Sequence, residues 1–209
     1  MRALCLAAGK GTRFGRLGSY LQKCMYPVGL QPFVAFTVQN LLGSGTVTPG
    51  RDTLTFIVGH HAEQVRAYFG ASVDGLAVHY LEQPDPLGTG HALALASKLD
   101  GGAPEEPWLI WLADAYVSGA QFQRLAAHRA STVLTLAPAH EGENPTVRVD
   151  VEEDRVVRAF QGTSDRYDAG AWKMSQQVMA GMTNVAANGE IRRAAALRPG
   201  RARTPPEPP

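Results

Sequence analysis

The sequence predicts an α/β fold with a mostly parallel central sheet. Three observations lead to this prediction. β-type apolar segments alternate with helix-type segments as far as residue 137, a continuous apolar run covers Trp108–Leu112, and strict apolar-polar alternation begins at residue 146. Alternating strands and helices build parallel sheets with right-handed crossovers. The apolar run is typical of a central strand buried on both faces.

Each expected element has its own local signal. Periodic apolar positions predict helices, and β-branched or apolar runs between glycines and prolines predict strands. The expected strands cover residues 4–6, 53–58, 76–81, 108–112 and 132–137. The expected helices cover residues 33–42, 62–69 and 118–129. Residues 146–151 and 155–160 alternate across the turn Glu152-Glu153-Asp154, which predicts an antiparallel hairpin.

Length and charge limit the classes of protein. The 209 residues suffice for one substantial domain and are few for two, so we expect a single domain over residues 1–198 and a mobile Pro/Arg-rich tail over 199–209. The chain carries 20 Lys and Arg against 19 Asp and Glu, a balance that does not favour nucleic acid as a partner. No signal-type leader or run of 18 apolar residues predicts a membrane association, so we expect a cytoplasmic protein with reduced Cys5 and Cys24.

The glycine-rich turn after the first strand is the first candidate site. The segment Ala7–Gly15 reads AAGKGTRFG, and such a turn can direct several backbone N–H groups at one anion. Arg13 adds a fork of donors and Lys23 a compact charge, which together suit a polyphosphate. The spacing matches neither the P-loop nor the dinucleotide-binding fingerprint. An ordinary strand-to-helix turn is the alternative interpretation.

Two later segments offer polar groups at the ends of predicted strands. Gln83 precedes the loop Leu87–His91, which opens a helix, and its amide can face a base edge. A surface loop capped by Thr89 is the alternative there. Asp114 follows the central strand, where ligands of open α/β sheets bind. A cap for the helix that begins near Ser118 is the alternative for Asp114.

These motifs resemble the signature of the sugar-phosphate nucleotidyltransferases. The resemblance is carried by LAAGKGTR at residues 6–13, by Lys23 with Met25-Tyr26-Pro27-Val28 after it, and by Gln83 with GTGHA at residues 88–92. It implies a Rossmann-like three-layer nucleotidyltransferase fold with a small antiparallel acceptor-side subregion. The NTP-binding part would cover residues 1–137 and the reduced acceptor-side part residues 138–198.

The resemblance also implies a reaction and its residues. A sugar-1-phosphate would attack the α-phosphorus of an NTP with Mg²⁺ bound, which releases pyrophosphate and forms an NDP-sugar. Arg13 and Lys23 would be catalytic, and Asp114 would hold the metal ion. The nucleotide-binding residues would be Leu6, Ala7, Ala8, Gly9, Gly11, Thr12, Gln83, Gly88 and Thr89. The partners would be the NTP and the sugar-1-phosphate, with a homo-oligomer as a further possibility.

The sequence departs from the family pattern mainly on the acceptor side. Gln22 and Ala113 replace the usual proline and glycine, and Gln161-Gly162-Thr163 replaces a Glu-Lys-Pro segment whose lysine meets the sugar phosphate. Lys173 is a possible substitute for that lysine, and Asn188–Ile191 resembles a later acceptor-side motif. A Trp-x-Asp segment with a second metal ligand is missing. Two alternatives therefore stay open: a nucleotide-binding sensor without transferase activity, and transfer to a non-sugar phosphorylated alcohol.

Overall fold

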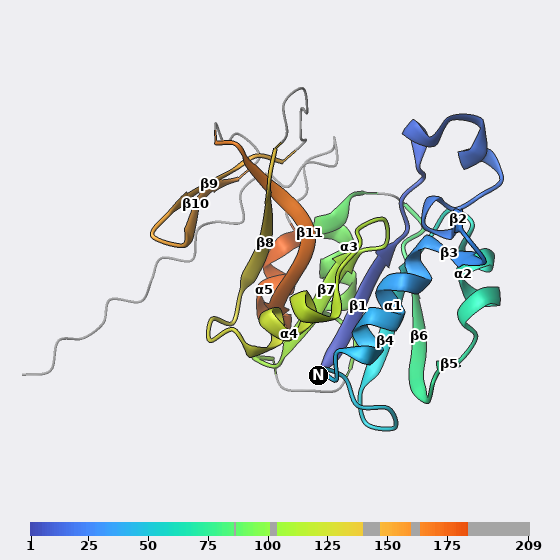
Figure 1. The fold of residues 1–209 in the computed structure, drawn as a ribbon, viewed down its shortest axis with the longest axis horizontal. Coiled ribbons are helices and arrows are strands. Elements are labelled where there is room, and N and C mark those ends of the chain that lie inside the picture. The colour runs from blue at the N-terminus through green and yellow to red at the C-terminus, as the bar shows by residue number, and fades with distance from the viewer. Residues whose placement is uncertain (86, 101–103, 140–146, 160–163, 184–209) are drawn as a thin grey trace, which may run out of the picture.

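A seven-stranded mixed sheet forms the centre of the molecule (Figure 1). The computed structural model describes residues 1–85, 87–100, 104–139, 147–159 and 164–183. The strand order is β5-β6-β4-β1-β7-β11-β8. The strands are β1 (Arg2–Ala7), β4 (Thr53–Val58), β5 (Ser72–Val73), β6 (Leu76–Glu82), β7 (Pro107–Leu112), β8 (Val133–Pro138) and β11 (Arg166–Ser175). Strands β6, β4, β1 and β7 are parallel, whereas β5 and β11 run antiparallel to their neighbours.

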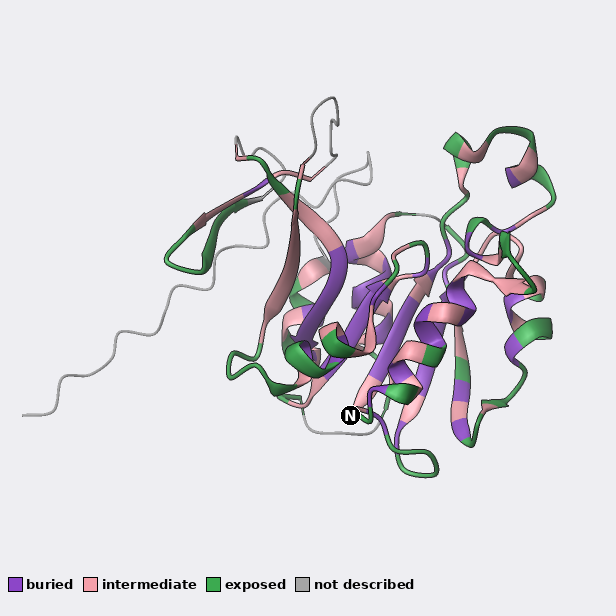
Figure 2. Cartoon of the chain, viewed as in Figure 1, coloured by how far each residue is buried: buried purple, intermediate pink, exposed green. Residues whose placement is uncertain are grey.

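Helices cover both faces of the sheet and complete three layers (Figure 2). The buried residues fall into two clusters because successive side chains of a strand point to opposite faces. Ala3, Cys5 and Ala7 pack in one cluster with α1 (Phe33–Gly43), α2 (Ala62–Phe69) and α4 (Gly119–Ala127). Leu4 packs in the other cluster with α3 (Thr89–Ala96) and α5 (Gln176–Ala180).

The chain reverses its direction of winding at β1. From β1 it proceeds outward through β4 to β6, and it then returns across the opposite face through α3 to β7, on the other side of β1. The connections from β1 to β4 and from β4 to β6 therefore cover one face of the sheet, and the connection from β6 to β7 covers the other. The two sets separate between β1 and β7. In open α/β sheets a ligand crevice forms at such a point, beyond the carboxyl ends of the two strands.

The elements predicted from the sequence are present with small shifts at their ends, and the mostly parallel α/β sheet is confirmed. The hairpin is also present, as β9 (Val149–Glu152) and β10 (Arg155–Ala159). Glu153 and Asp154 have positive φ at its turn, where the backbone twist matches that of the strands.

Strand β11 is the longest of the elements that the sequence did not reveal. Gly170 interrupts its pattern with φ of 76°, and the register with β8 shifts between Asp168 and Trp172. A Cβ at Gly170 would lie 3.0 Å from Leu112 Cδ1, so a side chain would meet the neighbouring strand. The strand separates β8 from β7, although the two run in the same direction.

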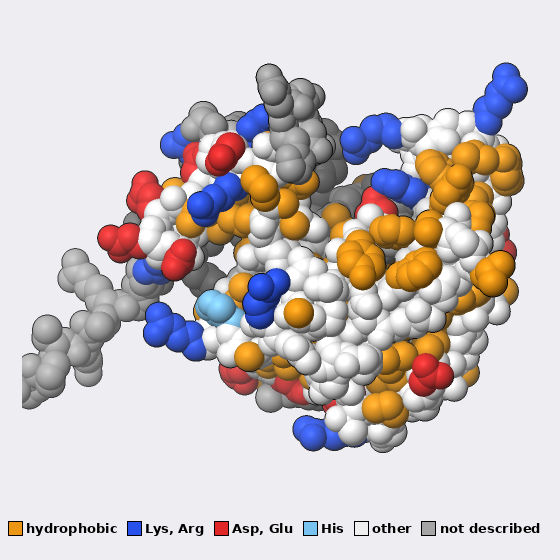
Figure 3. Space-filling model, viewed as in Figure 1, with side chains coloured by type: hydrophobic (Ala, Val, Ile, Leu, Met, Phe, Trp, Pro, Cys, Tyr) orange, Lys and Arg blue, Asp and Glu red, His pale blue; other side chains and the backbone are white. Residues whose placement is uncertain are grey.

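A small hairpin next to the glycine-rich segment exposes apolar side chains. Strands β2 (Pro27–Val28) and β3 (Gln31–Pro32) flank a tip at which Leu30 is fully exposed, and Tyr26 and Val28 are more than 40% exposed. Figure 3 shows hydrophobic side chains gathered on this part of the molecule. Among the described residues, none of the helices combines the length and the apolar character needed to span a membrane.

Part of the expected organisation lies outside the described residues. This applies to the tail over residues 199–209, to the Asn188–Ile191 motif and to the Gln161–Thr163 segment. The division of residues 1–198 at residue 137 stays a prediction.

Candidate active site

A cavity of about 860 Å³ lies beyond the carboxyl ends of β1 and β7. All of the residues expected to bind the nucleotide, the metal ion or the phosphates line it, although they come from four separate segments of the chain. They are Leu6, Ala7, Ala8, Gly9, Gly11, Thr12, Arg13, Lys23, Gln83, Gly88, Thr89 and Asp114. The winding of the chain therefore brings the three motifs to one place.

The glycine-rich turn presents free backbone donors to this cavity. Gly11 has φ of 59°, a left-handed conformation that favours glycine, and Phe14 N donates to Gly11 O at 2.7 Å. Within the described part of the chain, the amides of Gly9, Lys10 and Gly11 donate to no acceptor. The side chains of Lys10 and Arg13 are exposed beside them. Free amides and nearby cations make this turn suitable for an anion.

Gln22 fastens the turn to the sheet. Its buried side-chain Nε2 donates to Ala7 O at 2.7 Å and to His60 O at 3.0 Å, and it lies 3.2 Å from Gly9 O. The backbone N–H of Gln22 donates to Gln64 Oε1 at 2.9 Å. The side-chain amide of Gln22 thus ties the start of the glycine-rich turn, at Ala7 and Gly9, to His60, two residues beyond β4.

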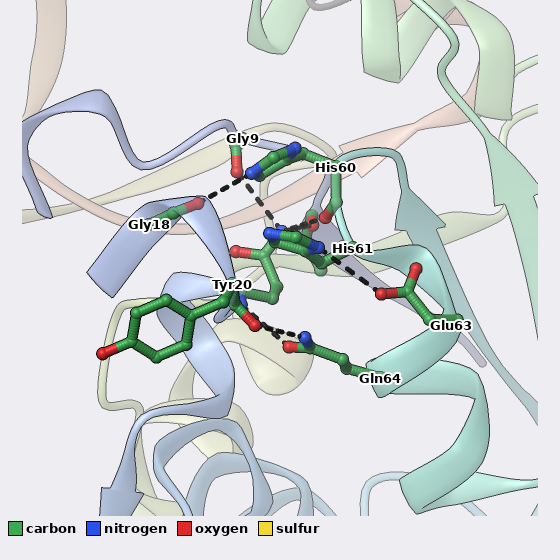
Figure 4. Close-up of polar contacts among 9 residues, drawn as sticks. Gly9, Gly18, Tyr20, His60, His61, Glu63 and Gln64 are labelled. Atoms are coloured by element: carbon green, nitrogen blue, oxygen red, sulfur yellow. Dashed lines mark hydrogen bonds and ion pairs between the residues drawn. The ribbon is translucent and has the colours of Figure 1, made fainter. Parts of the chain in front are cut away.

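The start of α2 supports the same turn from outside (Figure 4). The His60 ring Nε2 lies 2.8 Å from Gly18 O, and Gln64 Nε2 donates to Tyr20 O at 2.7 Å. Figure 4 shows these contacts side by side, with the His61 ring next to that of His60 and directed at Glu63. These partly exposed hydrogen bonds, together with the buried Gln22 amide, fix a loop that has little apolar surface of its own.

Lys23 and Asp114 form an ion pair at the cavity. Lys23 Nζ lies 2.5 Å from Asp114 Oδ2, and both side chains are about half exposed. Exposed pairs of this kind contribute at most about 1 kcal/mol to stability, so the pair can separate at low cost. After separation, a phosphate could pair with Lys23 and a metal cation with Asp114.

The alternative readings of Asp114 and Thr89 as helix caps are wrong. The N-cap of α4 is Ser118, which accepts from Gln121 N while Gln121 Oε1 accepts from Ser118 N, so the helix is capped without Asp114. The N-cap of α3 is Gly88, with φ of 92° and ψ of 177°, and this residue has no side chain with which to cap the helix. Thr89 is the first helical residue and lines the cavity.

Gln83 lines the cavity and is buried, with 5% of its surface exposed. Its Nε2 donates to Gly88 O at 3.1 Å and lies 2.9 Å from His91 Nδ1. Gly59, directly after β4, lets the segments that follow β6 and β1 lie close to it on either side, because a Cβ on it would lie 3.0 Å from Gln83 O and 3.1 Å from Ala8 O. The residue after β4 therefore fits between the Gln83 loop and the glycine-rich turn.

Lys173 does not reach this cavity. The Lys173 ammonium is buried on β11 and donates to Ala126 O at 3.1 Å and to His128 O at 2.7 Å, at the carboxyl end of α4. Burial lowers the pKa of Lys173, and the helix carbonyls stabilise the charged form that remains. Its role as a substitute for the acceptor-side lysine is therefore not supported by its position.

Sequence reasoning missed several residues that line or support the cavity. Gln22 stood out only as a departure from the family pattern, and His91 only as part of a motif. Cys24 also lines the cavity, where burial, followed by the nearby Asp114 charge, raises the pKa of its thiol to about 12. The thiol is therefore protonated at neutral pH and is not a nucleophile.

The donor set fits a magnesium ion that arrives with phosphates. The described residues contain no group of three or more His, Cys, Asp and Glu side chains that could hold a metal ion alone. Mg²⁺, however, is commonly held by one or two carboxylates together with substrate phosphates and water. Asp114 supplies one carboxylate beside the free amides of the glycine-rich turn.

Fold and cavity together define an α/β protein with a crevice at the switch point of its sheet, lined by free backbone amides and by the side chains of Arg13, Lys23 and Asp114. A family model described as the MobA-like NTP transferase domain matches residues 3–185, and the chain belongs to this family. The resemblance to sugar-phosphate nucleotidyltransferases is thereby confirmed.

Two curated relatives illustrate the range of the family. The chain is 31% identical over 173 residues to CMP-5'-(3-aminopropyl)phosphonate synthase of Streptomyces rubellomurinus. This match covers 82% of the chain and 26% of the relative. It is 38% identical over 165 residues to the bifunctional protein GlmU of Geobacter metallireducens, and this match covers 78% of the chain and 31% of the relative. The chain thus spans about a quarter to a third of the length of these relatives.

Solved structures confirm the Rossmann-like three-layer fold. A UDP-glucose pyrophosphorylase complexed with UDP-glucose superposes with a TM-score of 0.74 at 17% identity, over 91% of this chain and 82% of the other. The inositol-1-phosphate CTP transferase from T. maritima superposes with a TM-score of 0.68 at 17% identity, over 89% and 74%.

Proposed function

We propose that the protein transfers a nucleoside monophosphate from an NTP to a sugar-1-phosphate. The observation that carries the proposal is the convergence of free amides, two cations and one carboxylate at a single cavity. In the reaction, an acceptor phosphate oxygen forms a bond to the α-phosphorus, and the bond from that phosphorus to the bridging oxygen of pyrophosphate breaks. No protein nucleophile is needed, so the catalyst supplies alignment and charge.

Each group has a role that follows from its position. The free amides of Gly9 and Gly11 hold phosphate oxygens, and Arg13 neutralises the charge of the departing pyrophosphate. Lys23 moves from Asp114 to the α-phosphate, and Asp114 is then free to hold Mg²⁺. When bound, the ion withdraws charge from the phosphates. Gln83 and Gly88 meet the base.

A second candidate acceptor is a non-sugar phosphate or phosphonate. Two similar proteins support it by name: the 3-aminopropylphosphonate synthase and the inositol-1-phosphate transferase. The Lys173 ammonium donates to carbonyls at the end of α4 and does not line the cavity. Lys173 therefore does not supply the cation that was expected on the acceptor side. An acceptor with its own cationic group, such as an aminoalkylphosphonate, needs fewer cations from the protein.

Pyrophosphate release separates these proposals. The protein is incubated with Mg²⁺, each of the four common NTPs, and a panel of sugar-1-phosphates, inositol-1-phosphate and aminoalkylphosphonates. Release with a sugar-1-phosphate supports the main proposal, and release with only the other acceptors supports the second. NTP binding without release for any acceptor contradicts both and supports the sensor alternative.

A further inference from the structure

Asp114 lies in a tight turn directly after β7. Ala113 N donates to Leu6 O at 3.0 Å and continues the pairing of β7 with β1. Ala115 N donates to Leu112 O at 2.9 Å and closes the turn. After Ala115 the chain has no helix or strand until α4 begins. The direction of the Asp114 side chain therefore also depends on what holds the residues between this turn and α4.

Thr37 of α1 holds these residues through one hydroxyl group. Its Oγ1 donates to Ala115 O at 3.1 Å, and Val117 N donates to the same oxygen over 3.5 Å. A hydroxyl can do both, because it carries one donor hydrogen and two acceptor lone pairs. Thr37 is 0% exposed, and within the described part of the chain neither Ala115 O nor Val117 N has another partner. Loss of the hydroxyl would remove the one partner that each of these backbone groups has there.

Asn40 adds a third hydrogen bond to the same segment. A helical threonine commonly bonds to a carbonyl of its own helix, but that of Thr37 reaches a residue 78 positions further along the chain. Asn40, three residues later, also reaches across, since its Nδ2 donates to Val117 O at 2.9 Å. Residues three apart lie on the same side of a helix. One side of α1 therefore holds the segment that follows Asp114.

We propose that Thr37 is a positioning residue that keeps the Asp114 carboxylate directed into the cavity after Lys23 has left it. Before a ligand binds, the ion pair with Lys23 Nζ holds the carboxylate. In the proposed reaction Lys23 pairs with a phosphate, so the backbone around Asp114 becomes the remaining constraint. Thr37 does not line the cavity and acts only through this backbone. The inference rests on the proposed binding of an NTP with Mg²⁺, and it adds a residue outside the cavity to that site.

The coupling between Mg²⁺ and the NTP is the quantity to measure. Calorimetry without an acceptor gives the dissociation constant of whichever of ATP, GTP, CTP and UTP binds most tightly, once with Mg²⁺ and once with EDTA. The ratio of the constant in EDTA to the constant in Mg²⁺ measures how much the ion contributes to binding. We expect a ratio of about 30 for the wild type. For Asp114→Asn we expect about 2 or less, since the carboxylate that would hold the ion is lost.

Thr37→Val replaces the hydroxyl by a methyl group of similar size. Its ratio should fall about tenfold, as when a group that orients a metal ligand is removed. The dissociation constant in EDTA should stay within about twofold of the wild-type value, because the hydrogen bonds of Thr37 reach neither the glycine-rich turn nor Arg13. Thr37→Ser keeps the hydroxyl and should restore the wild-type ratio.

Ser44→Ala is the matched control, because it also removes a buried hydroxyl from the end of α1. Ser44 Oγ donates to Leu41 O at 2.6 Å and lies 2.7 Å from Thr46 Oγ1, so it does not hold the segment after Asp114. Its ratio should equal that of the wild type, even where the variant is less stable. Thermal melting checks that each variant is folded.

Asn40→Ala is a second test that does not depend on the folding of Thr37→Val. It removes only the hydrogen bond to Val117 O, so its ratio should fall in the same direction, by about threefold. An Asn40→Ala ratio equal to that of the wild type, with Thr37→Val unfolded, would overturn the inference.

The other outcomes are distinct. A Thr37→Val ratio within about twofold of the wild type overturns the role of Thr37. A Thr37→Ser or Ser44→Ala ratio as low as that of Thr37→Val also overturns it, because the loss would then follow from damage to α1. Equal dissociation constants of the wild type with Mg²⁺ and with EDTA overturn the metal role of Asp114 and this inference, while nucleotide binding survives. A wild-type protein that binds none of the four NTPs overturns the proposed function itself.

Discussion

Arg13 stands at the mouth of the cavity with its guanidinium exposed, so its contribution to folding is small while its charge is available to a ligand. We expect Arg13→Ala to lower the rate of pyrophosphate release by about 10²-fold or more, as when one charge-stabilising donor is lost. The matched control is Arg16→Ala, which removes an exposed arginine from the same 3₁₀ segment outside the cavity lining. Equal rates for the two variants would contradict the role of Arg13.

Asp168 gives a prediction about pH and stability. Burial raises the pKa of Asp168, and the hydrogen bonds from Gly170 N at 2.9 Å and Trp172 Nε1 at 2.8 Å only partly offset this. The folded state therefore holds its proton more tightly than the unfolded state, so this group destabilises the fold as pH rises from the ordinary pKa of 3.8 through the raised value.

Asp168→Asn removes that titration and keeps an oxygen for both donors. Urea titration measures the free energy of unfolding of both proteins. The value for the variant minus that for the wild type should increase with pH across this window and level off above it. A difference between the two proteins that stays constant with pH, or changes in the opposite direction, would show that the pKa of Asp168 is not raised.

At the scale of elements, the glycine-rich turn depends on side chains from elsewhere. The 3₁₀ segment Thr12–Ser19 contains one buried residue, Gly18, so it gains little from packing. The Gln22 amide, His60 and Gln64 replace that packing with hydrogen bonds to six backbone groups. Lys23 follows Gln22 directly, so the position of its ammonium depends on the same contacts.

Gln22→Leu should therefore weaken both stability and function. The carbonyls of Ala7 and His60 lose a buried donor, which costs roughly 1–3 kcal/mol in the free energy of unfolding. We expect kcat/KM for pyrophosphate release to fall about tenfold, since a small displacement of Lys23 is enough to misalign the phosphates. Urea unfolding and steady-state kinetics measure the two effects.

Gln39→Leu is the control for Gln22→Leu. Gln39 also makes side-chain amide hydrogen bonds, but to Gln31 on the exposed surface. Its substitution should change the free energy of unfolding by about 0.5 kcal/mol or less and leave the kinetics unchanged. The positioning role of Gln22 would be refuted by kinetics that match those of the control.

At the scale of the whole molecule, ligand binding should couple to the stability of the sheet. The cavity is built from residues that follow β1, β6 and β7, so an occupied site links segments more than 100 positions apart. With Mg²⁺ and an NTP at about 100 times its dissociation constant, mass action adds ~2.7 kcal/mol to the free energy of unfolding. For a chain of this size we expect Tm to rise by roughly 5–10 °C.

Differential scanning fluorimetry measures this shift. Mg²⁺ with the corresponding nucleoside, which lacks phosphates, is the control and should produce a much smaller shift. In the proposal the free amides of Gly9 and Gly11 bind phosphates. Equal Tm shifts with the nucleoside and the NTP would therefore contradict it, because the phosphates would contribute nothing to binding.

The sequence by itself determined five of the seven strands of the central sheet (β1, β4, β6, β7 and β8), the helices α1, α2 and α4, and the three motifs. Their signals are local: apolar periodicity marks residues 33–42 and 62–69, and the spacing of Gly9, Gly11, Arg13 and Lys23 predicts a phosphate-binding turn. The continuous apolar run before Asp114 likewise placed this carboxylate at the end of a central strand, and the structure has it there.

Only the tertiary structure decided how the parts meet. Strand β11 escaped prediction because Gly170 and Lys173 break its apolar pattern. Both residues are explained by other elements: a side chain at position 170 would meet Leu112 on β7, and Lys173 donates to carbonyls at the end of α4. The partners of Gln22 and the pairing of Gln83 with His91 depend on residues brought together by folding. A hydrogen bond is fixed by distance and direction in space, and neither is written in the spacing of residues along the chain.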